Sequence, residues 1–235
     1  MTTNKVICVT PMFNSEEYLP ELVSSIISQK NQNWEHVIVD DMSNDKSYEK
    51  ALELTKKDSR FKVIKSNEKK YPIRITIEES KKYQDENVII AMIDSDDALM
   101  NNNTVDIILN HYSDEELDTA WTAHYWDVHG MNISGDLYPD EDPYEVDWTT
   151  SHLKTFRSSI VKNLSNKNFK DDQGKWFKSA SDQVVYLPLL YISRKRKFIS
   201  DICYLYRVNL KGATNTNTHN QQSTVNFIRK RGFIK

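Results

Sequence analysis

The sequence is poor in glycine and in cysteine. Only five glycines occur in 235 residues, and neither GxGxxG nor GxxxxGK[ST] is present, which excludes the common glycine-rich loops that bind phosphate groups. The two cysteines, Cys8 and Cys203, lie inside apolar runs and lack the spacing of a zinc site. We therefore expect two buried free thiols in a reducing compartment.

Long apolar segments and an excess of one charge are also missing. No stretch approaches the roughly 20 apolar residues of a membrane-spanning helix. The apolar run in MTTNKVICVT is too short for a signal peptide, so we expect a cytoplasmic protein without a membrane span. The net charge is −3, and the basic runs Arg194–Lys197 and Arg229–Arg231 are interpreted as solvated surface charge. A nucleic-acid partner is therefore not favoured.

The most informative stretch that is present runs from Val88 to Met100, VIIAMIDSDDALM. Its apolar part, Val88 to Ile93, is typical of a strand buried on both faces of a parallel sheet. Three carboxylates and a serine follow directly, at the carboxyl end of the strand, where open α/β sheets bind their ligands. Crowded carboxylates repel one another, so a hard cation such as Mg²⁺ or Mn²⁺ is their natural companion. The alternative is a solvated acidic turn that caps the next helix.

The first hundred residues alternate between strand and helix patterns. Expected strands are 6–10, 36–39, 61–64 and 88–93, and the expected helices between them centre on 19–27, 45–57 and 73–83. This alternation predicts right-handed βαβ units, and hence an α/β fold with a mostly parallel central sheet and helices on both faces. Acidic groups also follow the second strand, at Asp40 and Asp41. We expect both acidic groups to lie at the same edge of the sheet.

The second half is less regular. We expect helices over 105–112, 152–164 and 182–193, strands over 119–125 and 198–208, and loops over 126–147 and 166–178. The strand over 119–125 alternates, which favours one buried face. We expect one domain over residues 1–208, divided into halves at residue 100, and a polar, mobile tail over 209–235 that closes over the site.

At this point the motifs resemble a known family. PMFNSEEYL, IVDDMSND and MIDSDD, in that order, resemble the nucleotide-sugar-binding half of glycosyltransferase family 2, which has the GT-A fold. ASDQVVYLPLL and DICYLYR resemble its second half, so the resemblance extends from about Val6 to Arg207. It implies a single-domain enzyme. The QxxRW signature of processive enzymes is absent, which favours single transfers.

The resemblance implies a set of nucleotide-binding residues. Thr10, Pro11 and Phe13 would line the base pocket, and Glu16 would lie near the base or the ribose. Asp41 would accept a hydrogen bond from the imide N–H of uracil, which indicates a UDP-sugar as donor. The remaining members of the set belong to the acidic turn and to the end of the last strand: Asp94, which would face the ribose, Ser95, and Arg207, which would meet a phosphate.

The resemblance also implies a metal ion, Mn²⁺ or Mg²⁺. Asp96 would bind the metal, the pyrophosphate would supply other ligands, and His219 in the tail would approach when a loop closes. A diphosphate leaving group carries about two negative charges, which a divalent cation neutralises.

Asp182, in SASDQ, resembles the carboxylate that acts as general base in this family. Many members carry Glu-Asp there, whereas this chain has Ser181-Asp182. The reference pKa of Asp is near 3.9, so the group is ionised at neutral pH and can accept the proton of an acceptor hydroxyl. The alternative is that Asp182 caps the following helix, and the two roles are compatible.

These expectations favour a metal-dependent, inverting glycosyltransferase that moves a sugar from a UDP-sugar to a hydroxyl-bearing acceptor such as a glycan. One alternative is a sugar-nucleotide nucleotidyltransferase, which would normally carry an early glycine-rich, basic phosphate loop that PMFNSEEYL does not resemble. Another is a non-catalytic module of the same fold that binds a nucleotide or sugar. The presence of both Asp96 and Asp182 argues against that module.

Overall fold

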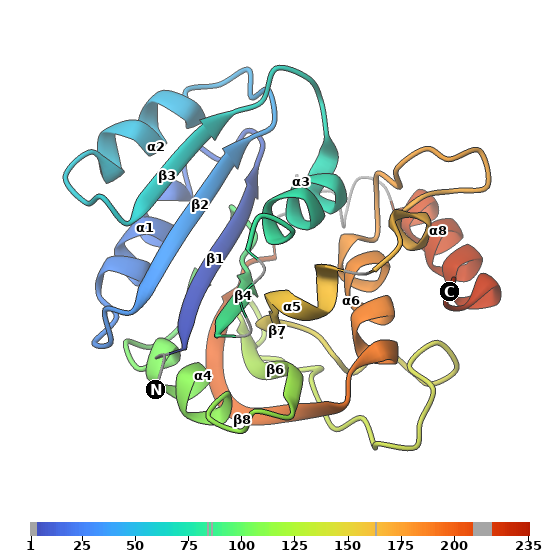
Figure 1. The fold of residues 1–235 in the computed structure, drawn as a ribbon. Helices are drawn as coiled ribbons and strands as arrows, with labels where there is room; N and C mark the ends of the chain where they lie inside the picture. The colour runs from blue at the N-terminus through green and yellow to red at the C-terminus, as the bar shows by residue number, and fades with distance from the viewer. Residues whose placement is uncertain (1–3, 84, 86, 163, 209–217) are drawn as a thin grey trace.

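The computed structural model describes residues 4–83, 85, 87–162, 164–208 and 218–235. Within these residues, eight strands form one curled sheet in the order β3-β2-β1-β4-β7-β6-β8-β5 (Figure 1). Strands β1 to β4 run parallel, whereas β7 is antiparallel to both of its neighbours, β4 and β6. The predicted α/β fold, mostly parallel with helices on both faces, is confirmed.

The first half contains the expected alternation. Its elements are β1 (Lys5–Met12), α1 (Leu19–Ile27), β2 (Trp34–Asp40), α2 (Ser47–Thr55), β3 (Phe61–Lys65), α3 (Tyr71–Ser80) and β4 (Val88–Met92). Because side chains alternate along a strand, β1 directs Val6 and Cys8 toward the core beneath α1, and Ile7 and Val9 toward the core that includes α3. Both faces of the sheet are therefore covered (Figure 1).

Strand β1 extends two residues beyond the predicted end at Thr10. Pro11 lies inside it and has no N–H for a ladder bond, yet it is tolerated. The carbonyl of Val9 accepts the N–H of Ile93, which lies one residue past the end of β4. Every second residue of β1 directs its backbone polar groups to the same neighbour, so the nitrogen of Pro11 also faces the β4 side. No strand is left there to accept a hydrogen bond from it. The added length carries the chain to the edge where the acidic groups lie.

The second half adds β5 (Ala98–Leu99), α4 (Thr104–His111), β6 (Leu117–Trp126), β7 (Lys154–Arg157), α5 (Ser158–Lys162), a 3₁₀ helix (Asn166–Phe169), α6 (Ser181–Ile192) and β8 (Lys195–Tyr206). Strand β6 was expected to bury one face, but its first eight residues are all buried because helices and loops cover both faces. Helix α6 continues through Pro188 without interruption.

The helix predicted over 152–164 is wrong in its first half. Residues 154–157 form strand β7, which inserts between β4 and β6, and only 158–162 are helical. Thr155 and Phe156 favour a strand, and all four residues of β7 are buried. Hydrogen-bonded pairing with β4 and β6 outweighs the short helical pattern in this segment. The strand also places Lys154 next to the candidate site described below.

The tail contains a helix that the sequence analysis did not anticipate. Helix α8 (Thr218–Arg231) packs beside α6, and Ile228 is buried in the core on that face (Figure 1). Residues 209–217, where the mobile tail was predicted to begin, lie outside the described residues. No helix in the described part of the chain is both long and apolar enough to cross a membrane.

Candidate functional site

Strained backbone marks one edge of the sheet. Among the described residues, four other than glycine adopt a positive φ: Asn14, Met42, Tyr71 and Ala180. Asn14 follows β1, Met42 follows β2, Tyr71 begins α3, and Ala180 immediately precedes α6. Such conformations cost of order 1–3 kcal/mol each and cluster at functional sites. The loop with Asn14 contacts the acidic turn after β4 through Ser15, and the start of α6 lies near it through Asp182.

The acidic turn is fixed by bonds from distant parts of the chain. The N–H of Asp94 donates to the hydroxyl of Tyr204 at 3.0 Å, and the hydroxyls of Ser95 and Ser15 are 2.6 Å apart. Ser95 is only 8% exposed, so its side chain ties this turn to the loop after β1. The turn after β4 is therefore joined to the loop after β1.

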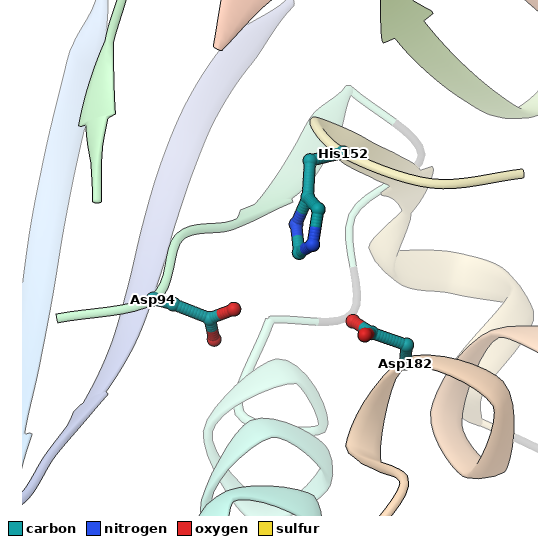
Figure 2. A group of neighbouring side chains, drawn as sticks. All are labelled: Asp94, His152 and Asp182. Carbon is teal, nitrogen blue, oxygen red and sulfur yellow. The ribbon is translucent and has the colours of Figure 1, made fainter. Parts of the chain in front are cut away.

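Three side chains from three different segments meet beside this turn. Asp94 follows β4, His152 precedes β7, and Asp182 lies in the first turn of α6, with ligand-type atoms all within 4.8 Å of one another. In Figure 2 the two carboxylates point toward each other beneath the ring of His152. His152 is buried and stacks on Tyr204, with ring centroids 4.9 Å apart. This cluster unites the two halves of the chain in one candidate active site.

A buried lysine completes the cluster. Lys154 is 1% exposed, and its ammonium lies 2.6 Å from Oδ1 of Asp182 and 3.2 Å from Nδ1 of His152. Asp182 is 41% exposed, so its carboxylate contacts the lysine on one side and remains open to a ligand. Asp182 does not cap α6: the N-cap residue is Ala180, and no side chain bonds the helix there. The helix-cap alternative is therefore wrong.

Burial and neighbouring charges raise the pKa values of two carboxylates in the site and lower that of a third. Burial, together with the nearby charge of Asp182, raises the pKa of Asp94 to about 7. Burial and the neighbouring Asp94 and Asp96 raise the pKa of Asp97 well above its usual range. Burial alone would also raise the pKa of Asp182, but the charge and hydrogen bond of Lys154, together with the neighbouring His152 and His124, lower the pKa to about 2. Asp182 is therefore the carboxylate that stays ionised.

Two sets of donors are candidates for a metal ion. The cluster of Asp94, His152 and Asp182 fits poorly, because the Lys154 ammonium already bonds two of its members. Asp96 fits better, since its charge contributes to the raised pKa values of Asp94 and Asp97, and a divalent cation would offset that repulsion. Hard carboxylate oxygens suit Mg²⁺ and Mn²⁺. His219 is exposed on α8 and is not part of the cluster.

Asp41 has a structural role that the sequence did not reveal. It is 2% exposed, and its two carboxylate oxygens accept the backbone N–H groups of Lys70 and Tyr71 at 2.7 and 2.9 Å. These are the N-terminal amides of α3, where a negative charge is favoured. The Lys69 ammonium lies 3.3 Å from the same carboxylate. Asp41 therefore joins the end of β2 to the start of α3.

The residues expected to line a base pocket differ in accessibility. Thr10 is fully buried, and its hydroxyl lies 2.8 Å from Nε2 of His36, so its side chain does not line a surface that a base could reach. Pro11 is half-buried, and Phe13 is 46% exposed. The ammonium of Lys69 lies 3.1 Å above the Phe13 ring, which closes a chain of contacts from Phe13 to Asp41.

Glu16 and Arg207 stiffen the loops around the site. Glu16 accepts the N–H of Lys46 at 3.2 Å, while its own N–H donates to Asp45 at 3.3 Å, so the loops after β1 and β2 are joined in both directions. Arg207 donates from Nε to the carbonyl of Asp96 at 2.8 Å. Its side chain contacts the acidic turn that was expected to hold the metal and the diphosphate.

One member of the site, Lys154, escaped the sequence analysis, because no motif singled it out. The segment that begins at His152 was expected to lie near the acceptor, but it was predicted to be helical. A signal was present nonetheless: in SHLKTFR the lysine follows Leu153 and precedes the strand-favouring pair Thr155 and Phe156, and a lysine is almost never buried without a charged partner.

Comparisons with known proteins agree with this geometry. The family model described as "Glycosyl transferase family 2" matches residues 7–166. The chain is 26% identical over 220 residues to the glycosyltransferase GlyG of Streptococcus pneumoniae, covering 85% of this chain and 69% of that protein. It is also 26% identical over 219 residues to TarP of Staphylococcus aureus, a poly(ribitol-phosphate) β-N-acetylglucosaminyltransferase, covering 87% of this chain and 63% of that protein.

A similar fold occurs among solved structures. S. aureus TarS in complex with UDP-GlcNAc superposes with a TM-score of 0.71 at 20% identity, covering 90% of this chain and 61% of that one. The chain thus spans about two thirds of these relatives or less. The family match covers more than half of the chain, includes β1 to β4 with the acidic turn, and coincides with the predicted motifs. The chain belongs to glycosyl transferase family 2.

Proposed function

We propose that this protein transfers a sugar from a UDP-sugar to an acceptor hydroxyl, with inversion at the anomeric carbon and with the help of a divalent metal ion. The observation that carries the proposal is the position of Asp182: an ionised, partly exposed carboxylate faces the acidic turn after β4. The family match and the relatives named as glycosyltransferases support it.

The chemistry of the site suits such a transfer. Asp182 would take the proton of the acceptor hydroxyl while the acceptor oxygen forms a bond to the anomeric carbon. The bond from that carbon to the diphosphate breaks, and UDP leaves. A general base contributes about 10²–10⁴-fold to the rate. Attack on the face opposite the leaving group gives inversion.

Asp96 is the proposed metal residue, and the turn that contains it is the proposed diphosphate site. A bound Mn²⁺ or Mg²⁺ would neutralise the charge that develops on the leaving diphosphate. Arg207 holds the backbone of the turn through the carbonyl of Asp96. Asp94 would face the ribose and Ser95 would keep the turn against the loop after β1. His219 remains a proposed additional ligand.

UDP is the preferred nucleotide, and UDP-GlcNAc is the first sugar donor to test. TarS of S. aureus has been solved with UDP and with UDP-GlcNAc, and TarP is named for the transfer of N-acetylglucosamine. In this chain Phe13 offers an exposed ring at the end of β1, and Asp41 lies at the end of β2. The ring of Phe13 suits stacking of a base, whereas a hydrogen bond from the base to Asp41 would have to be added to the two backbone N–H groups that its buried carboxylate already accepts.

A thermal-shift panel tests the donor site. UDP, GDP, dTDP and CDP would each be added with and without Mn²⁺ to the wild type and to Asp96→Ala. A ligand at 100 times its Kd adds about 2.7 kcal/mol to the stability of the folded state. We expect stabilisation by UDP that requires Mn²⁺ and is lost in Asp96→Ala. Absence of a shift with every nucleotide would contradict the proposal and would favour a non-catalytic module.

A further inference from the structure

The side chain of Lys154 occupies an unusual position for a lysine. It is 1% exposed, in a strand that pairs with β4 on one side and with β6 on the other. Lys154 lies opposite Met92 in one pairing and opposite Trp121 in the other, so its backbone is fixed within the sheet. Burial of an ammonium is costly unless it is paired and hydrogen-bonded. The fold therefore tolerates this lysine only because of the partners it finds.

Both partners belong to the candidate active site. The ammonium is 2.6 Å from Oδ1 of Asp182 and 3.2 Å from Nδ1 of His152. His152 accepts at Nδ1 and is stacked against Tyr204 and Tyr206, which fixes the plane of its ring. His152 therefore orients the Lys154 ammonium, which contacts the 41% exposed side chain of Asp182.

We propose that Lys154 is a positioning residue for Asp182: its buried ammonium holds one carboxylate oxygen so that the other faces the acceptor hydroxyl. The inference rests on the proposed function of Asp182 as general base and extends it to a residue that never touches the substrate. Lys154 also supplies the positive charge of the Asp94–His152–Asp182 cluster, so that cluster does not require a metal ion of its own.

The electrostatic surroundings of Asp182 agree with this role. The groups that face it are Asp94 after β4, Lys154 and His152 at β7, and His124 on β6. Asp94 repels its charge, whereas Lys154 attracts it at hydrogen-bond distance. Burial lowers the pKa of His152 to about 3 and that of His124 to about 4, so neither carries a charge at neutral pH. Lys154 is then the cation that keeps Asp182 ionised.

The main experiment compares wild type, Lys154→Met and Lys195→Met. Methionine keeps an unbranched, flexible side chain one heavy atom shorter than that of lysine and removes the charge. Lys195 is a matched control, because it is half-exposed on β8 and pairs with Asp114, away from the cluster. The assay measures release of UDP from UDP-GlcNAc with Mn²⁺, with water as acceptor, over a range of pH.

For Lys154→Met we expect kcat at pH 7 to fall at least 100-fold and KM to change less than threefold. The acidic limb of the pH profile should move up by at least one pH unit, because Asp182 loses the charge that keeps it ionised. Lys195→Met should match the wild type. In Lys154→Ala, methylammonium should restore part of the rate and the bulkier tetramethylammonium should not. An unchanged profile in Lys154→Met would overturn the proposal.

A second measurement needs neither turnover nor a folded variant at position 154. The ¹³C carboxyl signal of Asp182, assigned by its loss in Asp182→Asn, would be titrated by NMR in the wild type. We expect Asp182 to remain ionised from pH 7 down to pH 4, and a midpoint at or above pH 4 would overturn the inference. If the wild type releases no UDP from any donor, the proposed function fails. The titration still decides whether Asp182 is held ionised in the folded protein, as its contact with Lys154 requires.

Discussion

The backbone N–H of Arg207 donates to Oδ1 of Asp97 at 2.7 Å, at the point where β8 leaves the sheet. The guanidinium of Arg207 also bonds the carbonyl of Asp96 at 2.8 Å. The last strand of the sheet therefore closes over the acidic turn that follows β4, although 110 positions of sequence separate the two residues. Integrity of the proposed diphosphate site depends on this closure.

Removal of the Arg207 guanidinium should loosen the turn. Arg207→Gln keeps the backbone bond to Asp97 and loses the charge-assisted bond to Asp96, so we expect a loss of about 1–2 kcal/mol in the free energy of unfolding. The affinity for UDP with Mn²⁺ should fall about tenfold, measured by calorimetry. Glu21→Gln is the control, since it breaks only a surface ion pair with Arg207 and should cost less than about 1 kcal/mol. Equal effects of both variants would contradict this account.

Asp41 should contribute to stability as well as to nucleotide binding. Asp41→Ala removes the acceptor of two backbone N–H groups at the start of α3, and we expect a loss of about 2–3 kcal/mol in urea unfolding. Asp41→Asn retains one carbonyl oxygen and should cost less. If Asp41→Ala changes stability by less than 0.5 kcal/mol (about the scatter among ordinary surface substitutions), the capping role is wrong.

His36 should make stability fall as the pH is lowered. Burial lowers its pKa to about 3 in the folded state, whereas the unfolded chain binds the proton near pH 6.5. Between these values the unfolded state binds one more proton, so unfolding becomes easier by about 1.4 kcal/mol for each pH unit lost. His36→Gln should remove this contribution to the slope and leave those of His152 and His124, whose pKa values burial also lowers.

Thr10→Val is the matched control for that measurement. It removes the hydroxyl that lies 2.8 Å from the His36 ring but leaves the ring buried. Stability should fall at every pH while the slope is retained, because burial and not the hydrogen bond lowers the pKa of His36. A slope lost in both variants would assign the effect to the hydrogen bond instead.

The first half of the chain could be predicted because each of its strands and helices is specified by residues close together in the sequence. Apolar runs end in Asp40 and in Asp94, helical spacing fills the intervals, and parallel connectivity brings the acidic ends together. Asp182 was predicted only through the family resemblance, and its role stays a prediction. The place of Lys154 could not be predicted, because it depends on an antiparallel strand that pairs with partners more than thirty residues away in sequence. The capping contacts of Asp41 likewise depend on where α3 begins.

The central claim is that Asp182 acts as the general base of a transfer from a UDP-sugar. The most direct measurement is release of UDP from UDP-GlcNAc with Mn²⁺ by the wild type and by Asp182→Asn, alongside the Kd for UDP by calorimetry. We expect the variant to lose about 10²–10⁴-fold in rate while its Kd stays within about threefold of the wild type, since Asp182 is assigned to the acceptor and not to the nucleotide. Equal rates in the two proteins would contradict the account.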